Sequence, residues 1–170
     1  MSRETVWAGK FLQVVQDGRW EYVERTGDID AAVIVAVNEG HLLMIEQHRV
    51  PAGRRCLELP AGLVGDDPVD DGGEAETATD AAARELEEET GYRAARVEAL
   101  GSFYSSPGMT SERFTLVRAS GLTRVGAPEE GIVLHRVPLA DVPAFIAAKR
   151  DEGLGIDAKL LLFVGVGLTA

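Results

Sequence analysis

A run of carboxylates between Arg84 and Gly91 is the feature that most constrains this chain. The segment reads Arg-Glu-Leu-Glu-Glu-Glu-Thr-Gly, and in a helix Glu85 and Glu89 lie on one face. Like charges at this spacing repel each other, and oxygen-only ligands suit hard ions such as Mg²⁺ or Mn²⁺. Gly91 is typical of a residue that ends a helix. The run therefore predicts either a cation-binding helix or a solvated acidic helix.

A longer pattern around this run favours the cation-binding alternative. Glu76, seven further residues and then Arg84 to Tyr92 resemble the Nudix box of the Nudix hydrolase family. In the family the box reads Gly, five residues, Glu, seven residues, and then Arg-Glu-aliphatic-any-Glu-Glu-any-Gly-aliphatic. From Glu76 onward the chain matches this pattern, except that Tyr92 stands at the last aliphatic position.

The box glycine is displaced in the sequence. Asp70 stands where it would be, whereas Pro60-Ala61-Gly62-Leu63-Val64 resembles the family's loop into the box. We therefore take Gly62 as the box glycine and residues 65–73, rich in Gly, Asp and Pro, as an exposed insertion. Lengthening a loop costs little, roughly 0.6 kcal/mol for each doubling, so we expect the metal site to tolerate the insertion.

Composition limits the kinds of binding partner and the cellular compartment to be expected for this chain. The chain has 170 residues, 45% of them hydrophobic, and a net charge of −11, as expected for a globular and acidic domain. Such acidity disfavours nucleic acid and anionic membranes, and an anionic substrate would need divalent cations as a bridge. The single cysteine, Cys56, excludes an internal disulfide and favours a reducing, cytoplasmic location. We expect no signal peptide in residues 1–10, and the apolar run 160–168 is shorter than the about 20 residues that cross a bilayer.

Hydrophobic periodicity predicts a mixed α/β protein. Alternation in residues 5–25 around Asp17-Gly18 predicts a hairpin, and the apolar run 31–37 predicts a strand buried on both faces. Further strands are expected at 41–47, 56–59, 97–104, 112–119 and 132–137, the box helix at 77–90, and closing helices at 139–150 and 157–168. The resemblance implies the Nudix fold, an α/β/α sandwich with a mixed sheet, here with an N-terminal β-strand extension. We expect residues 1–28 to serve dimerisation and base binding, and residues 29–170 to form the hydrolase domain.

Two segments outside the box resemble the ADP-ribose pyrophosphatase subfamily. The first is Ser106-Pro107-Gly108-Met109-Thr110-Ser111-Glu112, fifteen residues beyond the box. In the subfamily the glutamate of this loop activates or positions the attacking water, and Glu112 matches it; Met109 is expected to contact the substrate. Taken alone, Pro107-Gly108 would be an ordinary turn.

The second segment is Glu46-Gln47-His48-Arg49, followed by Glu58-Leu59-Pro60-Ala61-Gly62. The resemblance implies that Arg49 grips substrate phosphate, for which a guanidinium is well suited. It also implies that the backbone carbonyl of Ala61 is a metal ligand and that Glu58 orders the loop. His48 is expected to be structural.

The N-terminal strands carry a third resemblance. In related ADP-sugar pyrophosphatases two aromatic side chains, one from each subunit of a homodimer, enclose the adenine, and Phe11 and Trp20 match them. Glu21 and Arg25 match a glutamate and an arginine that contact the substrate. The alternative is that aromatic residues on these strands are ordinary core residues.

Together these matches predict a metal-dependent hydrolase that splits ADP-ribose into AMP and ribose 5-phosphate. Glu85, Glu89 and the Ala61 carbonyl would bind two or more Mg²⁺ ions, or Mn²⁺ in their place. Glu112 is the expected base, Glu88 is a ligand or base, and Arg84 orients Glu88. Glu76 would be an outer ligand or a salt-bridge partner.

Three alternatives remain open. Another nucleotide sugar such as GDP-mannose would use the same box. A non-catalytic nucleotide-sugar-binding protein would keep the fold but is typically expected to have a degraded box and an added basic domain. A purely structural protein would have only a solvated acidic helix.

Overall fold

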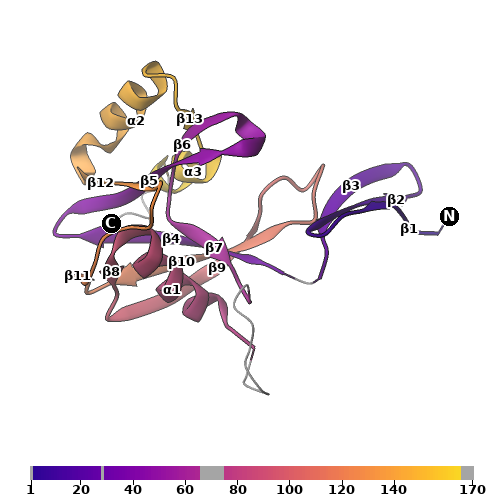
Figure 1. The fold of residues 1–170 in the computed structure, drawn as a ribbon, viewed down its shortest axis with the longest axis horizontal. Coiled ribbons are helices and arrows are strands. Elements are labelled where there is room, and N and C mark those ends of the chain that lie inside the picture. Colours follow the sequence, from indigo (N-terminus) through magenta and orange to yellow (C-terminus); the bar gives the residue numbers. More distant parts are fainter. Residues whose placement is uncertain (1, 28, 66–74, 166–170) are drawn as a thin grey trace.

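The computed structural model describes residues 2–27, 29–65 and 75–165, with side chains up to residue 161. A layered α/β body carries a small three-stranded sheet that projects from one side (Figure 1). The predicted insertion at 65–73 lies almost wholly outside the described residues. None of the helices in the described part of the chain has the length and apolarity needed to cross a membrane.

A mixed sheet forms the centre of the body, in the order β13-β6-β5-β4-β10-β9, with β12 paired to β5 and β7 paired to β4. Its strands are β4 (Ala31–Asn38), β5 (His41–Arg49), β6 (Arg54–Glu58), β7 (Ala61–Leu63), β9 (Arg96–Tyr104), β10 (Arg113–Ser120), β12 (Val133–Pro138) and β13 (Gly155–Ile156). Strand β4 runs parallel to β10 and antiparallel to β5 and β7. The short strands β8 (Tyr92–Arg93) and β11 (Thr123–Arg124) pair separately.

Helices cover both faces of this sheet, which confirms the predicted α/β/α sandwich. The helices are α1 (Ala78–Thr90), α2 (Val142–Asp151) and α3 (Ala158–Gly165), with short 3₁₀ turns η1 (Val50–Ala52) and η3 (Leu139–Asp141). Alternate residues of β4 divide between the two sides, as the period of a strand requires. Ala32, Ile34 and Ala36 pack with Leu86 of α1.

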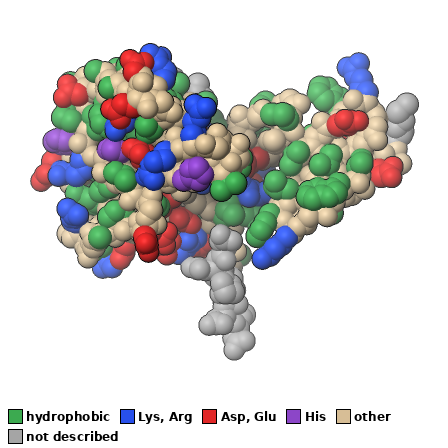
Figure 2. All heavy atoms as spheres, turned by 45° about the horizontal axis from the view of Figure 1, so that its top comes forward, with side chains coloured by type: hydrophobic (Ala, Val, Ile, Leu, Met, Phe, Trp, Pro, Cys, Tyr) green, Lys and Arg blue, Asp and Glu red, His purple; other side chains and the backbone are tan. Residues whose placement is uncertain are grey.

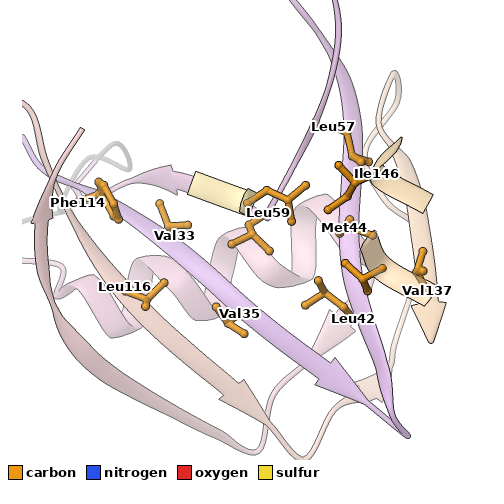
Figure 3. Packing of buried hydrophobic residues seen from close by; sticks show 12 residues of the cluster. Val33, Val35, Leu42, Met44, Leu57, Leu59, Phe114, Leu116, Val137 and Ile146 are labelled. Carbon is orange, nitrogen blue, oxygen red and sulfur yellow. The ribbon is translucent and has the colours of Figure 1, made fainter. Parts of the chain in front are cut away.

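The opposite side of β4 faces the second core, shown in Figure 3. Val33 and Val35 pack there with Met44 of β5, Leu116 of β10 and Ile146 of α2. Both faces of β4 are therefore dry, which explains why its sequence is apolar throughout rather than alternating.

Helix α1 is fixed at both ends by local contacts. The Thr77 side chain accepts a hydrogen bond from the backbone N–H of Asp80, and the Asp80 carboxylate accepts one from the N–H of Thr77, completing a capping box. At the other end Gly91 has φ of 72° and its N–H bonds to the carbonyl of Glu87. These caps fix which residues of α1 face the sheet and which face the loop Ala61–Leu63.

The projecting sheet consists of β1 (Glu4–Ala8), β2 (Leu12–Asp17) and β3 (Trp20–Arg25). Strands β2 and β3 form the predicted hairpin, with Asp17 opposite Trp20 at its turn and Leu12 opposite Arg25 at its base. Large apolar side chains of this sheet stay exposed, among them Val6, Trp7, Phe11, Leu12 and Trp20. Figure 2 shows hydrophobic side chains on the surface of this sheet. The alternative that Phe11 and Trp20 are core residues is therefore wrong for this single chain.

The end of the chain differs in detail from the prediction. We predicted helices at 139–150 and 157–168, but α2 begins at Val142 after a separate 3₁₀ turn, and Pro143 lies in its first turn. Proline lacks the N–H that a helix interior needs, so it favours this later start. In α3, Leu160 is buried whereas Leu161 is 50% exposed; residues 166–168 of the predicted helix lie outside the described residues.

We predict that Gly91→Ala destabilises the protein much more than Gly53→Ala. Both glycines have positive φ, 72° and 63°, so both substitutions carry the cost of a left-handed alanine, about 1 kcal/mol. A Cβ at Gly91 would also lie 2.5 Å from the Gly126 carbonyl oxygen, whereas at Gly53 nothing lies within 4 Å. Urea unfolding should give about 2–4 kcal/mol for Gly91→Ala and about 1 kcal/mol for Gly53→Ala. Equal losses would contradict the close packing at Gly91.

Candidate active site

The acidic face of α1 packs directly against the loop formed by β7. A Cβ at Gly62 would lie 1.9 Å from the Cδ of Glu85, so only glycine leaves room for this carboxylate. This close approach gives a steric reason for a glycine at position 62, which we took as the box glycine from the sequence. Strand β7 and helix α1 are thus in close contact at the candidate site.

Glu89 is the most deeply buried carboxylate of the helix, with 6% of its surface exposed. Its Oε2 accepts a hydrogen bond of 2.9 Å from the backbone N–H of Ala61, and its Oε1 one of 3.4 Å from the amide of Gln47. Burial raises the pKa of Glu89 to about 8, because loss of water disfavours the charged form. The nearby charge of Glu85 raises this pKa further, and the Ala61 N–H lowers it.

Arg84 gathers the remaining carboxylates of the box. Its Nη1 donates to Glu85 at 2.7 Å and to Glu88 at 3.3 Å, and its Nε donates to Glu76 at 3.1 Å. A further bond of 3.1 Å joins Nη2 to the carbonyl of Leu63, so the guanidinium also ties α1 to β7. Of the two alternatives for Glu76, this geometry favours the salt-bridge partner.

The environment of these carboxylates differs from one to the next. Burial raises the pKa of Glu85, although Arg84 opposes the shift. The pKa of Glu76 is lowered, mainly by its hydrogen bond from Arg84 and also by one from the Gly65 N–H. Glu88 is the most exposed of the group.

The donor set suits a hard divalent cation, because the carboxylates of Glu85 and Glu89 are short of water and lie against the loop, Glu85 at Gly62 and Glu89 at the Ala61 N–H. Among the described residues, however, no three acidic, histidine or cysteine side chains converge into a ready-made metal group. In this conformation Arg84 supplies the positive charge at Glu85 and Glu88. The donor atoms therefore suit a divalent cation by their chemistry, but in this conformation they are not arranged as a complete coordination sphere.

A cavity of about 800 Å³ opens beside this loop. Four of the predicted site residues line it: Arg25, Arg49, Ala61 and Glu112. They come from the N-terminal sheet, β5, β7 and the loop before β10. The predicted phosphate-binding arginine, one predicted metal ligand and the predicted base thus reach one cavity, whereas the box residues Arg84, Glu85, Glu88 and Glu89 are not among those that line it.

Arg49 is anchored at the wall of the cavity by Glu58. The guanidinium donates two bonds, Nε to Oε1 at 2.9 Å and Nη2 to Oε2 at 2.6 Å, and Glu58 is 5% exposed. The Arg49 side chain is 44% exposed. This pairing fixes one edge of the guanidinium and leaves the arginine accessible; the predicted role of Glu58 in ordering the loop stays a prediction.

Glu112 is held from two sides. Its Oε1 accepts a bond of 2.7 Å from Nη2 of Arg25, and its Oε2 accepts one of 3.0 Å from the Ser105 hydroxyl. About a third of the Glu112 side chain remains exposed, at 35%. The carboxylate is therefore oriented yet open to solvent.

Other predicted site residues lie outside the described cavity wall. Phe11, Trp20 and Met109 are 65%, 57% and 61% exposed, and Glu21 is also exposed. All four lie on the N-terminal sheet or on the loop that contacts it. A single chain does not bring them onto the cavity.

The structure also reveals charged residues that the sequence analysis did not identify. The N–H of Glu129 bonds to the carbonyl of Glu88 at 2.9 Å, and the Glu129 charge raises the pKa of Glu85. Asp157 and Lys159, paired at 2.7 Å, line the far wall of the cavity. Glu129 lies 44 positions beyond Glu85 in a segment without a box-like motif, so only the fold discloses this proximity.

Comparison with known proteins agrees with the geometry. The NUDIX domain model matches residues 28–156. An uncharacterised Nudix hydrolase of Schizosaccharomyces pombe is 31% identical over 170 aligned residues, covering 89% of this chain and 78% of that protein. An ADP-ribose pyrophosphatase of Bacillus subtilis is 34% identical over 66% of this chain, which spans 60% of the Bacillus protein. The solved structure of an ADP compounds hydrolase shares the fold, with a TM-score of 0.64, 23% identity, and 85% and 81% of the two chains covered.

We predict that the metal-free protein loses stability as pH rises from 4.5 towards 8, in part through Glu89. Its pKa is 4.5 ordinarily and about 8 in the fold. In this interval the native state therefore holds a proton that the unfolded state releases, so the stabilisation is complete below pH 4.5 and lost above 8. Glu89→Gln should remove about 2–4 kcal/mol of this pH dependence, measured by urea unfolding with chelator.

Glu87→Gln is the matched control, because Glu87 lies on the same helix but its side chain is 39% exposed and paired with Arg93. If Glu89→Gln kept the pH dependence of the wild type, the carboxylate of Glu89 would not be the buried proton-binding group.

Proposed function

This chain belongs to the NUDIX domain family and is a Nudix hydrolase, and on that premise we propose that it hydrolyses ADP-ribose to AMP and ribose 5-phosphate. The observation that carries the proposal is the meeting of Glu85 and Glu89 with the Ala61–Gly62 loop, beside a cavity that Arg49 and Glu112 also line. The Bacillus relative named ADP-ribose pyrophosphatase supports the choice of substrate.

In this proposal Glu85, Glu89 and the Ala61 carbonyl hold Mg²⁺, with Mn²⁺ as a substitute and two or more ions in the site. When bound, these ions neutralise the diphosphate and lower the pKa of water. Glu88 is a further ligand or base. Arg84 keeps these carboxylates in register, because it is bonded to both Glu85 and Glu88.

Arg49 binds the diphosphate of the substrate. Its guanidinium is fixed by Glu58 on one edge and accessible from the cavity, so little side-chain entropy is lost when an anion binds. A guanidinium also offers paired donors that match phosphate oxygens. An anion in the cavity can still bind Arg49, because Glu58 is nearly buried whereas the guanidinium is exposed.

Glu112 acts as the base that takes the proton from the attacking water. It lines the same cavity as Ala61, and both of its oxygens accept hydrogen bonds that orient the carboxylate. Positioning of this kind is the first requirement for general base catalysis, before any adjustment of pKa. Met109, on the same loop, would contact the substrate.

The nucleobase is held by the N-terminal sheet, residues 1–28, in a homodimer. Phe11 lies next to the base of the β2–β3 hairpin and Trp20 lies at its turn. Five residue steps along the strand separate these ends, about 17 Å, which is too far for one chain to enclose a base. A second copy would place its Phe11 opposite this Trp20, with Glu21 beside the base, and would cover exposed apolar surface of the sheet. Arg25, also predicted to contact the substrate, lies at the other end of the hairpin and is bonded to Glu112.

We predict that the purified protein releases AMP from ADP-ribose only when a divalent cation is present. Product analysis with ADP-ribose and GDP-mannose side by side, each with Mg²⁺ or with chelator, measures this directly. We expect Mg²⁺-dependent AMP well above any product from GDP-mannose. Glu85→Gln and Glu89→Gln should raise the Mg²⁺ requirement sharply, because each removes one charged ligand. Preferred turnover of GDP-mannose would overturn the substrate assignment.

We predict that Glu112→Gln lowers kcat by about 10²–10⁴, because glutamine keeps the size of the side chain and one acceptor oxygen but cannot accept the proton. Glu129→Gln is the informative comparison, since Glu129 is a second carboxylate near the box helix. Initial rates at saturating ADP-ribose and Mg²⁺ measure both variants. Near wild-type kcat in Glu112→Gln, together with a large loss in Glu129→Gln, would transfer the role of base to Glu129.

A further inference from the structure

We propose that the N-terminal sheet is a clamp for the loop of residues 105–112, and that Arg25 is a positioning residue for Glu112 of the same chain. The clamp extends the role expected for residues 1–28 beyond base binding and dimerisation. Its catalytic consequence rests on the proposed function, whereas the clamp itself is a property of the fold.

Backbone hydrogen bonds join the loop to the free edge of β3. The N–H of Val23 donates to the carbonyl of Met109 at 3.0 Å, and the N–H of Ser111 donates to the carbonyl of Val23 at 3.1 Å. Val23 and Thr110 thereby form a parallel bridge. Since the other edge of β3 pairs with β2, the loop extends the N-terminal sheet by one more member.

The side chain of Arg25 adds a charged contact two residues further along β3. Its Nη2 lies 2.7 Å from Oε1 of Glu112, and the two side chains are 26% and 35% exposed. The second oxygen of Glu112 is held by Ser105, whose N–H also donates to the Glu112 carbonyl at 3.2 Å. One oxygen of the carboxylate is thus fixed by the loop itself and the other by the N-terminal sheet.

The loop has little apolar packing that could replace these bonds. Most of residues 105–111 are exposed, including Met109 at 61%. Inside the loop the N–H groups of Met109 and Thr110 both donate to the carbonyl of Ser106 at 2.9 Å, which closes a turn but does not tie it to the body. An exposed segment held by a few hydrogen bonds opens easily when one anchor is removed.

The clamp residues precede the family domain. The NUDIX domain match begins at residue 28, whereas Val23 and Arg25 lie before it. Figure 1 shows the projecting sheet beside the loop that leads into β10. A segment outside the common domain thereby sets the orientation of a carboxylate inside it, and we infer that the N-terminal sheet is part of the catalytic unit.

The first test removes the charged contact. Arg25→Met, Arg25→Lys and the control Arg3→Met are compared by hydrogen exchange without substrate and by kinetics with ADP-ribose and Mg²⁺. Arg3 is the matched control because it pairs with Glu24 on the same sheet. We expect Arg25→Met to speed exchange in residues 105–112 about tenfold and to lower kcat about 10- to 100-fold with KM changed less than about threefold. Arg25→Lys should recover part of the loss, and Arg3→Met should resemble the wild type.

A double variant and a mixture of two variant chains complete the test. If Arg25 acts through Glu112, Arg25→Met should lower the kcat of the Glu112→Gln variant by less than about twofold. Co-expressed Arg25→Met and Glu112→Gln chains should regain no activity if the contact lies within one chain. Recovery towards about a quarter of the wild-type rate, as random pairing of the two chains would give, would show that Arg25 serves the partner's loop and would overturn the assignment.

Hydrogen exchange keeps the clamp separate from the proposed reaction. If ADP-ribose were not a substrate, faster exchange of residues 105–112 in Arg25→Met would still support the clamp. Unchanged exchange in that variant would overturn the clamp whatever the substrate. A raised KM with unchanged kcat would make Arg25 a substrate-binding residue only.

Discussion

A carboxylate kept almost out of water is the constraint around which the site is built. Glu89 lies beneath the Ala61–Gly62 loop, and one backbone N–H compensates only part of the lost hydration. Its charged form gains from any cation that reaches the loop. The absent side chain of Gly62, the capped ends of α1 and the dry faces of β4 all serve to keep this helix and loop in contact.

The positive groups of the site are each held by a carboxylate. Arg49 pairs with Glu58, Arg84 with Glu76, Glu85 and Glu88, and Arg25 with Glu112. In a chain of net charge −11 these pairs keep guanidinium groups oriented without making the cavity strongly cationic. In the proposed function an anionic substrate would meet fixed donors, and divalent cations would balance the charge, as expected from the composition.

Local patterns predicted the elements well because their causes are local. The buried strand β4, the hairpin at Asp17-Gly18 and the box helix follow from runs, turns and caps that the sequence shows directly. Contacts between distant segments could not be read in this way. The bond between Arg25 and Glu112, and the approach of Glu129 to the box helix, depend on how sheets and loops pack. The roles of individual site residues remain predictions, because spacing identifies donors but not what they bind.

The capping box at Thr77 makes the start of α1 independent of the segment before it. Thr77 and Asp80 satisfy each other's backbone and side-chain groups, so the helix needs no signal from residues further upstream. Natural selection can therefore lengthen that segment without rotating Glu85 or Glu89 away from the loop. For protein engineering, the same autonomy marks the position ahead of Glu76, which itself pairs with Arg84, as an acceptor site for a grafted peptide or a reporter domain.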